Sequence, residues 1–511
     1  MNLDVVIVGS GFGGSIAALR LAQAGKQVLV LERGRRWAPS DFPRDPREVG
    51  RVFWHLGAVE RLQGLFDVRF LSGVGVVAAA GVGGGSLIYA NIHIRPDADV
   101  FDAWPRPFSR AMLDPYYDKV AAALHVAPTP PQIELAKREW FKETARDLGF
   151  ASFDPDQAVA WDDPDAPGRH RCELCARCEF GCTLGAKNTL DVTYLRDAEA
   201  LGARVLTGVR VTHVARAHAA DGYTVFAEEL DTRASISFTA PRVVLAAGTL
   251  GTNDILLQSR DTYHSLPGLS PRLGQGFSAN GDFLGTLQGA KTRIDGWHGP
   301  DVTTVMRCEQ DGQRFTLAAP TFNRPTYELL ASLGVTRELP RSAGDWHSLG
   351  SVLRTAFRLG AFSQPLPIAL PGAGDPAHLT NLFAIGRDNA GGRLQLNRGE
   401  LDIMWNYAEE NSGLIDAMDA VMQRIAGSSA GRYAPIPTWS MFHRPLTVHP
   451  LGGCHLSDSA ETGVVNPQGE VHDAPGLFIA DGSVIPSAIG FHPAMTISAV
   501  CEHIASGLQR N

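Results

Sequence analysis

The sequence predicts an α/β fold, α+β overall, in which a parallel sheet is assembled from segments that lie far apart in the chain. Three short runs, at residues 3–8, 242–247 and 477–480, are almost wholly apolar, and each leads into a glycine or an Asp-Gly pair. Such runs are typical of strands buried on both faces of a parallel sheet. Residues 282–405 instead contain stretches of alternating apolar and polar side chains with frequent proline and glycine, which predicts a mostly antiparallel sheet.

Length, composition and charge limit the class of protein. The chain has 511 residues, of which 44% are apolar and 20% charged, and this predicts a soluble protein of about two to four domains. The net charge of −8 gives no electrostatic reason to expect nucleic acid as a partner. No run reaches the ~18 apolar residues of a transmembrane segment, and no signal peptide is expected. Four of the seven cysteines lie between residues 172 and 182, which suits a reduced compartment, so a cytoplasmic location is expected.

The N-terminal segment has the pattern of a dinucleotide-binding βαβ unit. A strand at Leu3–Val8 precedes a glycine cluster, a helix at Ser15–Ala24 and a second strand at Gln27–Leu31. The cluster contains Gly9, Gly11, Phe12, Gly13 and Gly14. Its glycines let the backbone approach a pyrophosphate at the helix N-terminus, and Glu32 can accept a hydrogen bond from a ribose hydroxyl. A βαβ unit with incidental glycines is the alternative interpretation.

A second glycine-rich segment, Ala78–Asn91, distinguishes between the common dinucleotide cofactors. Gly81, Gly83, Gly84 and Gly85 occur within five positions, which suits a backbone lying flat against a ring or a phosphate. A nicotinamide enzyme built on one βαβ unit needs no second segment of this kind. The flavin ring of FAD reaches far beyond the first unit, so the sequence favours FAD.

The central part of the chain mixes helical and strand patterns. Helices are expected at Leu113–Ala123, Ile133–Leu148, Thr189–Ala198, Thr249–Leu257 and Asp416–Ala426. Strands are expected around Val209 and Val211, and a hairpin over Tyr223–Phe238. A stretch rich in proline and aspartate at residues 154–168 predicts a mobile loop.

A run of four cysteines, Cys172, Cys175, Cys178 and Cys182, has the spacing of the bacterial ferredoxin run, except that Thr183 replaces its proline. In that run the fourth cysteine serves another cluster, so a single cluster here would need Cys182 to bend back, a remote cysteine or a three-cysteine site. The remote cysteines are Cys308, Cys454 and Cys501. Zinc usually uses two separated pairs, and no second pair follows. Two interpretations of the run therefore remain open, an iron–sulfur cluster and structural thiols, and both are favoured over a zinc site.

The C-terminal region carries two histidines, His449 and His492, each followed by a proline. His449 lies in a glycine-rich loop. An apolar strand between the two histidines ends at Asp481 and Gly482, where a contact with a bound dinucleotide is expected. His492 and Pro493 open an apolar helix, with the proline suited to the first helical position. The free amides and positive dipole end of this helix can stabilise negative charge.

Together these segments resemble the glucose–methanol–choline (GMC) family of FAD-dependent oxidoreductases and, within it, the cholesterol oxidase-like branch. The resemblance is carried by Gly9–Gly14 with Glu32, Gly83–Asn91, Gly181–Asp191, His449–Cys454 and Asp481–Ile497. These segments are spread over the whole chain. Residues 282–440 carry almost no recognisable signature, so the resemblance says little about the substrate.

The resemblance implies a discontinuous Rossmann-type FAD-binding domain at residues 1–95, 182–281 and 441–511. An insertion or lid with the cysteine-rich loop would occupy 96–181, and a substrate-binding domain on a mostly antiparallel sheet 282–440. The residues expected to bind FAD are Gly9, Gly11, Phe12, Gly13, Gly14, Glu32, Arg33, Gly83, Gly84, Gly85, Ser86, Asn91, Val211, Ala247, Gly248, Asp481, Gly482, His492 and Pro493. No histidine stands where covalently flavinylated relatives carry one, so non-covalent FAD is expected.

The resemblance also implies oxidation of an alcohol to a carbonyl by hydride transfer to flavin N5, with His449 as base and His492 as its partner. A neutral imidazole can accept the hydroxyl proton, which is worth roughly 10²–10⁴-fold in rate. The cholesterol oxidase-like branch carries asparagine at the second position, so a steroid substrate does not follow. The expected partners are a small apolar alcohol and either oxygen or a redox partner. A non-redox or light-driven flavoenzyme and a flavin/iron–sulfur electron-transfer dehydrogenase remain alternatives.

Overall fold

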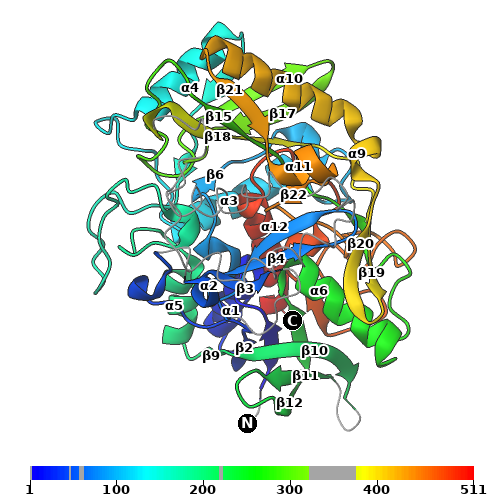
Figure 1. The fold of residues 1–511 in the computed structure, drawn as a ribbon. Coiled ribbons are helices and arrows are strands. Elements are labelled where there is room, and N and C mark those ends of the chain that lie inside the picture. Colours follow the sequence, from blue (N-terminus) through cyan, green and yellow to red (C-terminus); the bar gives the residue numbers. More distant parts are fainter. Residues whose placement is uncertain (1–2, 45–47, 57–62, 218–221, 322–375, 511) are drawn as a thin grey trace.

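A parallel five-stranded sheet forms the base of the molecule as drawn in Figure 1. The structure is a computed structural model, and it describes residues 3–44, 48–56, 63–217, 222–321 and 376–510. Its strand order is β23-β13-β1-β2-β9. The strands are β1 (Val5–Val8), β2 (Val28–Leu31), β9 (Arg204–Leu206), β13 (Arg242–Leu245) and β23 (Leu477–Ile479). Apolar side chains on both faces bury this sheet, and the prediction of a parallel sheet assembled from distant segments is confirmed.

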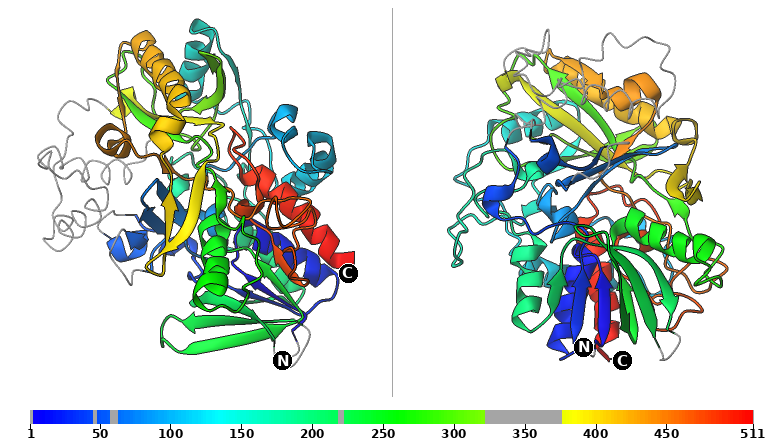
Figure 2. Two further views of the ribbon diagram at one scale, coloured as in Figure 1. Left: turned by 90° about the vertical axis from the view of Figure 1, so that its right-hand side faces the viewer. Right: turned by 60° about the horizontal axis from the view of Figure 1, so that its bottom comes forward.

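Helices from both ends of the chain cover this sheet. Helix α1 (Phe12–Gln23) packs against α12 (Ala494–Arg510) and α5 (Tyr194–Ala200), and α12 also packs against α3 (Arg110–Ala123). Arg20 of α1 pairs with Glu502 of α12 at 2.6 Å, and the Tyr194 hydroxyl donates to the same carboxylate at 2.8 Å. Glu502 is fully buried, and its contact with Arg20 joins the first and last helices of the chain (Figure 2).

A six-stranded antiparallel sheet forms the upper half of the molecule in Figure 1. In order, its strands are β21 (Arg432–Pro435), β15 (Phe283–Gln288), β18 (Leu379–Gly386), β17 (Gln313–Ala318), β16 (Val305–Gln310) and β7 (Ala151–Phe153). Helix α10 (Ser412–Ser428) packs on this sheet, and α4 (Ala136–Asp147) lies beside them. The predicted antiparallel sheet is thus present, while residues 322–375 of the predicted substrate domain lie outside the described ranges.

Smaller sheets accompany these two large sheets. A four-stranded sheet between them contains β22 (Leu446–Thr447), β5 (Gly75–Ala79), β4 (Phe66–Phe70) and β3 (Phe53–Leu56). Two three-stranded sheets consist of β10 (Val209–Arg216), β11 (Tyr223–Glu229) and β12 (Ser235–Ala240), and of β14 (Gln275–Phe277), β19 (Gly392–Asn397) and β20 (Glu400–Met404). The last pair is β6 (Ile92–His93) with β8 (Asp156–Gln157). Short helices are α2 (Val49–Val52), α9 (Tyr407–Glu410) and α11 (Pro437–Phe442), and the longer α6 covers Gly248–Leu257.

Several element boundaries differ from those predicted. Helix α1 begins at Phe12 rather than Ser15, because Gly11 is its N-cap and the glycines after it are helical. Helix α3 begins at Arg110 because the Ser109 hydroxyl accepts a hydrogen bond from the Met112 amide. Helix α12 begins one residue later than predicted, since the Pro493 carbonyl accepts its first hydrogen bond, from the Ile497 amide.

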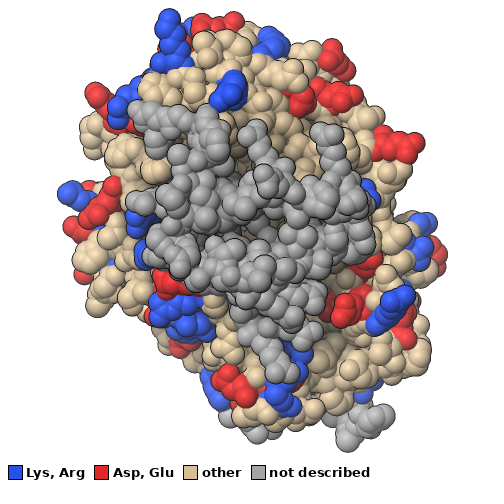
Figure 3. Space-filling model, in the orientation of Figure 1, with Lys and Arg blue, Asp and Glu red and all other residues tan. Residues whose placement is uncertain are grey.

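Surface charge is mixed on the face drawn in Figure 3. Lysine and arginine side chains alternate there with aspartate and glutamate over the described surface. None of the helices in the described ranges combines the length and the apolar character needed to cross a bilayer.

Candidate active site

A cavity of about 1790 Å³ lies between the parallel sheet and the six-stranded sheet. Its walls come from the loops after β1, β2 and β13, from β4 and β5, from β18, and from the segments that carry His449 and His492. Single ligand sites usually enclose roughly 300–1,000 Å³, so this cavity has room for a large cofactor and a substrate together.

The first glycine cluster packs the start of α1 tightly against the parallel sheet. A Cβ added at Gly13 would lie 1.5 Å from the Ala480 carbonyl oxygen, and one at Gly14 would lie 2.0 Å from the Gly9 carbonyl oxygen. Gly9 itself has a φ of +96° and abuts the Ala246 carbonyl. These three glycines therefore bring the N-terminus of α1 to the edge of the sheet, where it faces the cavity.

Glu32 ends β2 beside this cluster. Its carboxylate accepts hydrogen bonds from the Ser10 hydroxyl at 2.6 Å, from the Ser10 amide at 3.1 Å and from the Gly34 amide at 2.8 Å. The residue is buried yet lines the cavity, together with the neighbouring Arg33. The protein thus holds a carboxylate at the position predicted for a ribose contact.

The two glycine-rich segments meet directly. A Cβ at Gly84 would lie 2.6 Å from the Gly11 Cα, and the Gly83 amide donates to the Ser10 hydroxyl at 3.1 Å. Gly84 and Gly85 line the cavity. This contact explains why a second glycine-rich segment accompanies the first, since Gly84 has no room for a side chain against the Gly11 backbone.

Not all of the predicted cofactor residues reach the cavity. Those that line it are Gly9, Gly11, Phe12, Gly13, Glu32, Arg33, Gly84, Gly85, Val211, Ala247, Gly248, Asp481, Gly482, His492 and Pro493. Gly14, Gly83, Ser86 and Asn91 are not among the residues that line it. The Ser86 hydroxyl, for example, bonds to the Gly83 carbonyl and to the Leu190 amide, so it ties two segments of the protein together.

Asp481 connects β23 to the N-terminus of α6. One carboxylate oxygen accepts hydrogen bonds from the Ser483 amide and hydroxyl, and the other from the Gly248 amide and the Thr252 hydroxyl. Burial raises the pKa of this carboxyl. Because protein groups donate all four hydrogen bonds, Asp481 acts on the shape of the cavity by fixing the backbone around it.

His449 and His492 lie side by side in the cavity wall. Their ring centroids are 5.3 Å apart and their planes are inclined by 76°. Phe383 of β18 stacks on His449 at 5.5 Å and faces the edge of His492 at 6.0 Å. The two histidines predicted from the C-terminal motifs are therefore brought together, next to an aromatic side chain of the six-stranded sheet.

The two imidazoles differ in their surroundings. His449 Nδ1 lies 2.8 Å from the Asp282 carboxylate. Neither ring nitrogen of His492 has a hydrogen-bond partner among the described residues, although the ring is buried. Burial, with a smaller contribution from the charge of His449, lowers the pKa of His492, so its ring is neutral near pH 7. The pair thus combines one anchored imidazole with one free one.

Sequence reasoning missed the segment that holds both histidines, Ser278–Asp282. Asp282 binds His449, whereas the Asn280 amide group donates to the Phe491 carbonyl and accepts from the Ile489 and Gly490 amides, just before His492. Asp282 and His449 are 167 positions apart. No spacing rule relates residues so distant, and no local pattern in the sequence marked Asp282.

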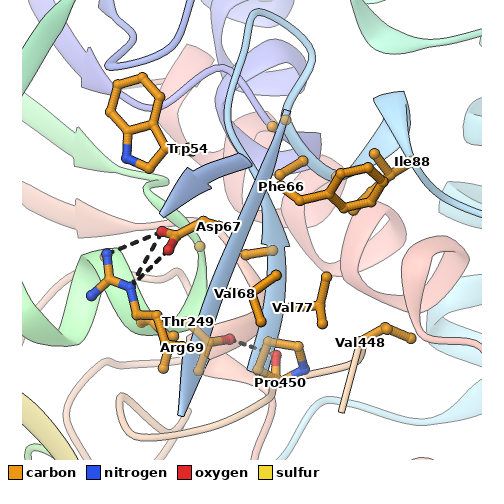
Figure 4. Close-up of a pocket in the computed structure, with 18 of the residues that line it drawn as sticks. Trp54, Phe66, Asp67, Val68, Arg69, Val77, Ile88, Thr249, Val448 and Pro450 are labelled. Atoms are coloured by element: carbon orange, nitrogen blue, oxygen red, sulfur yellow. Dashed lines mark hydrogen bonds and ion pairs between the residues drawn. The ribbon is translucent and has the colours of Figure 1, made fainter. Parts of the chain in front are cut away.

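A second missed group lies on the β4 wall, shown in Figure 4. Asp67 pairs with Arg33 at 2.7 Å and with Arg69 at 3.0 Å, and its carboxylate is 2% exposed. Beyond it, Val68 and Val77 turn apolar side chains toward the segment that leads to His449 (Figure 4). The wall is therefore charged near Arg33 and apolar near the histidines.

Among the described residues, neither the cysteine run nor any other group of three or more histidine, cysteine or acidic side chains is arranged to hold a metal ion. Cys172, Cys178 and Cys182 are half-buried and Cys175 is exposed. Burial raises the pKa of Cys172 to about 11 and raises that of Cys178 as well. Cys308, Cys454 and Cys501 are buried in other elements, β16, the His449 loop and α12.

The cavity fits FAD by its own features. The glycine contacts leave bare backbone at the α1 N-terminus, Glu32 supplies an acceptor near it, and the orphaned nitrogens of His492 need a polar partner at the far end. Pro493 and Ala494, at the start of α12, line the cavity beside His492. FAD, in which a pyrophosphate joins an adenosine to the flavin part, matches this order, since its adenosine and pyrophosphate would lie near the glycines and its ring near His492.

Known proteins resemble this chain over its whole length. A family model described as GMC oxidoreductase matches residues 53–277 and 397–501, and an FAD binding domain matches residues 4–38. A cholesterol oxidase of Mycobacterium tuberculosis is 32% identical over 99% of this chain and 91% of its own length. A long-chain-alcohol oxidase of Arabidopsis thaliana is 25% identical over 99% of this chain and 67% of its own length.

Solved structures share the fold. A pyridoxine 4-oxidase from Mesorbium loti superposes with a TM-score of 0.67 at 16% identity, covering all of both chains. A fungal aryl-alcohol oxidase gives a TM-score of 0.61 at 16% identity over 100% of this chain and 99% of that chain. At this identity the likeness concerns the fold alone.

Proposed function

The chain belongs to the GMC oxidoreductase family and is an FAD-dependent oxidoreductase that acts on alcohols, and on this premise we propose that His449 is its base and His492 its orienting partner. The observation that carries the proposal is the 5.3 Å approach of the two imidazoles in the wall of the cavity. Bound FAD supplies the hydride acceptor for the alcohol carbon.

The protein moves one proton in this proposal. Because Nδ1 of His449 is engaged with Asp282, Nε2 is the nitrogen left to accept the proton of the substrate hydroxyl. His492 is neutral and has a ring nitrogen free to hydrogen-bond the same oxygen, which fixes the direction of the carbon–hydrogen bond. Loss of the proton to His449 and of a hydride from carbon converts the alcohol to a carbonyl.

We propose FAD contacts for the residues predicted from the glycine motifs that line the cavity. The N-terminus of α1 would hold the pyrophosphate and Glu32 the adenosine ribose. The start of α12 at Pro493 would lie against the flavin ring, where its dipole stabilises negative charge. The domain division at residues 1–95, 182–281 and 441–511 agrees with the origin of the five parallel strands, which all lie in these ranges.

The substrate proposed is an apolar alcohol. The cavity wall around the histidines is rich in apolar side chains, and the related enzymes are named for cholesterol and long-chain alcohols. The apolar wall residues include Val77, Leu284, Val302, Phe383, Ile436, Phe442, Leu446 and Val448. Oxygen is the proposed acceptor, because these relatives are oxidases by name.

A substrate panel tests this proposal. Oxygen uptake and peroxide release would be measured with long-chain, aryl and sterol alcohols, and with glycerol, glucose and choline as polar comparisons. We expect turnover of apolar alcohols that His449→Gln abolishes and His503→Gln leaves intact, since His503 lies outside the cavity lining and bonds to the Pro467 carbonyl. Turnover of the polar compounds alone, or an active His449→Gln variant, would refute it.

The cysteine run keeps its iron–sulfur interpretation as a prediction, supported by its spacing alone. Iron and acid-labile sulfide analysis of protein purified without oxygen decides it, and stoichiometric iron would shift the proposed acceptor from oxygen to a redox partner. A cytoplasmic location is also proposed, supported by seven cysteines that are all free thiols. Cell fractionation tests that location.

A further inference from the structure

Asp282 has the contacts of a residue that serves His449 rather than the fold at large. Its side chain is fully buried, and one carboxylate oxygen lies 2.8 Å from His449 Nδ1. The other oxygen accepts from the Thr447 hydroxyl and the Val448 amide, both at 2.9 Å. The Thr447 hydroxyl also accepts a hydrogen bond from the His449 amide at 2.9 Å. Asp282 therefore holds the His449 ring directly and the His449 backbone through Thr447.

We propose that Asp282 is the positioning residue of the reaction: it fixes the tautomer and orientation of His449 and holds the charge that the ring acquires. This inference rests on the proposed role of His449 as base. A carboxylate can only accept, so it selects the imidazole form that carries its proton on Nδ1. That form presents a lone pair on Nε2, which a base needs.

The second part of the role is electrostatic. When His449 takes the hydroxyl proton, an imidazolium forms in a wall that is largely buried, and an unpaired charge there is costly. Asp282 compensates it at hydrogen-bond distance with one carboxylate oxygen, while Thr447 and Val448 donate to the other. The substrate proton therefore ends on Nε2 of His449, next to the carbonyl product, while Nδ1 of the same ring stays bound to the Asp282 carboxylate.

Other titratable groups near this pair are less suited to the role. Burial, with smaller contributions from the charges of Asp388 and Asp282, raises the pKa of Tyr407 in α9 well above its usual value, so this residue stays a neutral phenol. Asp388 accepts from the Ser278 hydroxyl and from the Ala279 and Gly281 amides, and thereby orders the segment that carries Asp282. His492 faces His449 from the segment just before α12 and has no carboxylate partner among the described residues.

Nitrogen NMR of histidine-labelled protein tests the tautomer without substrate or turnover. The His449 signals are assigned by their loss in His449→Gln. We expect the wild-type ring to be protonated on Nδ1, and Asp282→Asn to reverse this, because an asparagine amide can donate to Nδ1 and leave the proton on Nε2. A wild-type ring protonated on Nε2 would overturn the proposal, even if the variant failed to fold.

Kinetics supply the second arm. Asp282→Asn should lower the rate constant of flavin reduction by about 10²–10⁴-fold, the range for a misoriented base, while KM for the alcohol changes about threefold or less. The matched control is Asp402→Asn, a buried aspartate of β20 that accepts from Ser72 and Ile403 and lies outside the cavity lining. Equal losses in both variants, or a loss in KM alone, would assign Asp282 a purely structural role. An inactive wild type with the Nδ1 tautomer would instead refute the proposed function while leaving the positioning geometry intact.

Discussion

His449 and His492, which are 43 positions apart in the chain, lie with ring centroids 5.3 Å apart and ring planes inclined by 76°. One ring is anchored to a buried carboxylate, and the other has no partner for either nitrogen among the described residues. Because their surroundings differ, the two rings can have different roles in the reaction. The anchored ring can hold a positive charge, and the neutral ring can only orient.

Replacing His492 tests the orienting role. We expect His492→Ala to lower the rate constant of flavin reduction about 10²-fold, because the alcohol oxygen loses the group that fixes its direction. His492→Asn keeps a donor and an acceptor at the site and should lose about tenfold. Stopped-flow absorbance under anaerobic conditions measures both. Equal rates for the alanine and asparagine variants would show that hydrogen bonding by residue 492 is immaterial.

Two glycines of the first cluster should respond differently to the same substitution. Gly13→Ala places a Cβ 1.5 Å from the Ala480 carbonyl oxygen, which forces the helix off the sheet and costs about 1–3 kcal/mol or more in unfolding free energy. Gly11→Ala meets nothing closer than the Gly84 Cα at 3.9 Å, so the fold tolerates it while the methyl group narrows the proposed pyrophosphate site.

Thermal unfolding and the FAD content per chain separate these two effects. We expect a lower Tm for Gly13→Ala, and a near-normal Tm of the FAD-free protein with reduced FAD affinity for Gly11→Ala. Full FAD affinity in Gly11→Ala would argue against a pyrophosphate at this loop.

Stability should fall at acid pH in part because of His93. Burial lowers the pKa of this histidine to about 3, so the folded state requires the neutral ring. The unfolded chain protonates this histidine below about pH 6.5, whereas the folded protein does so only near pH 3. The unfolding free energy therefore falls as the pH drops from about 6.5 toward 3, and the loss is about 2 kcal/mol at pH 5. Urea unfolding at pH 7.5 and pH 5 should therefore show a smaller acid loss in His93→Met. The exposed His298→Gln serves as control, and an unchanged acid loss in His93→Met would contradict the prediction.

The Asp67 cluster on the cavity wall should matter more than a surface ion pair. Asp67→Ala leaves Arg33 and Arg69, each about one-quarter exposed, without their shared carboxylate. We expect a loss of about 2 kcal/mol in unfolding free energy. The exposed pair of Arg196 with Asp197, both 51% exposed, gives the comparison, and Asp197→Ala should cost about 0.5 kcal/mol or less. Urea unfolding of both variants would contradict this account if the two losses were equal.

The sequence allowed the parallel sheet, the helix after Gly11 and the histidine pair to be predicted, because each depends on local patterns or on motifs with fixed partners. It did not show that the Ser86 hydroxyl ties two segments of the protein together, since spacing alone does not decide which way the side chains of a glycine-rich segment point. Asp282 escaped prediction for a different reason. Its contact with His449 exists only after the two halves of the molecule have packed together.

The central claim is that His449 accepts the substrate proton, and single-turnover reduction of the FAD-loaded protein by an apolar alcohol without oxygen tests it most directly. The wild type should bleach its flavin absorbance in a fast single phase. His449→Gln should bind FAD and alcohol but bleach about 10²–10⁴-fold more slowly, the loss expected for a missing general base. Reduction of His449→Gln at the wild-type rate would contradict the account.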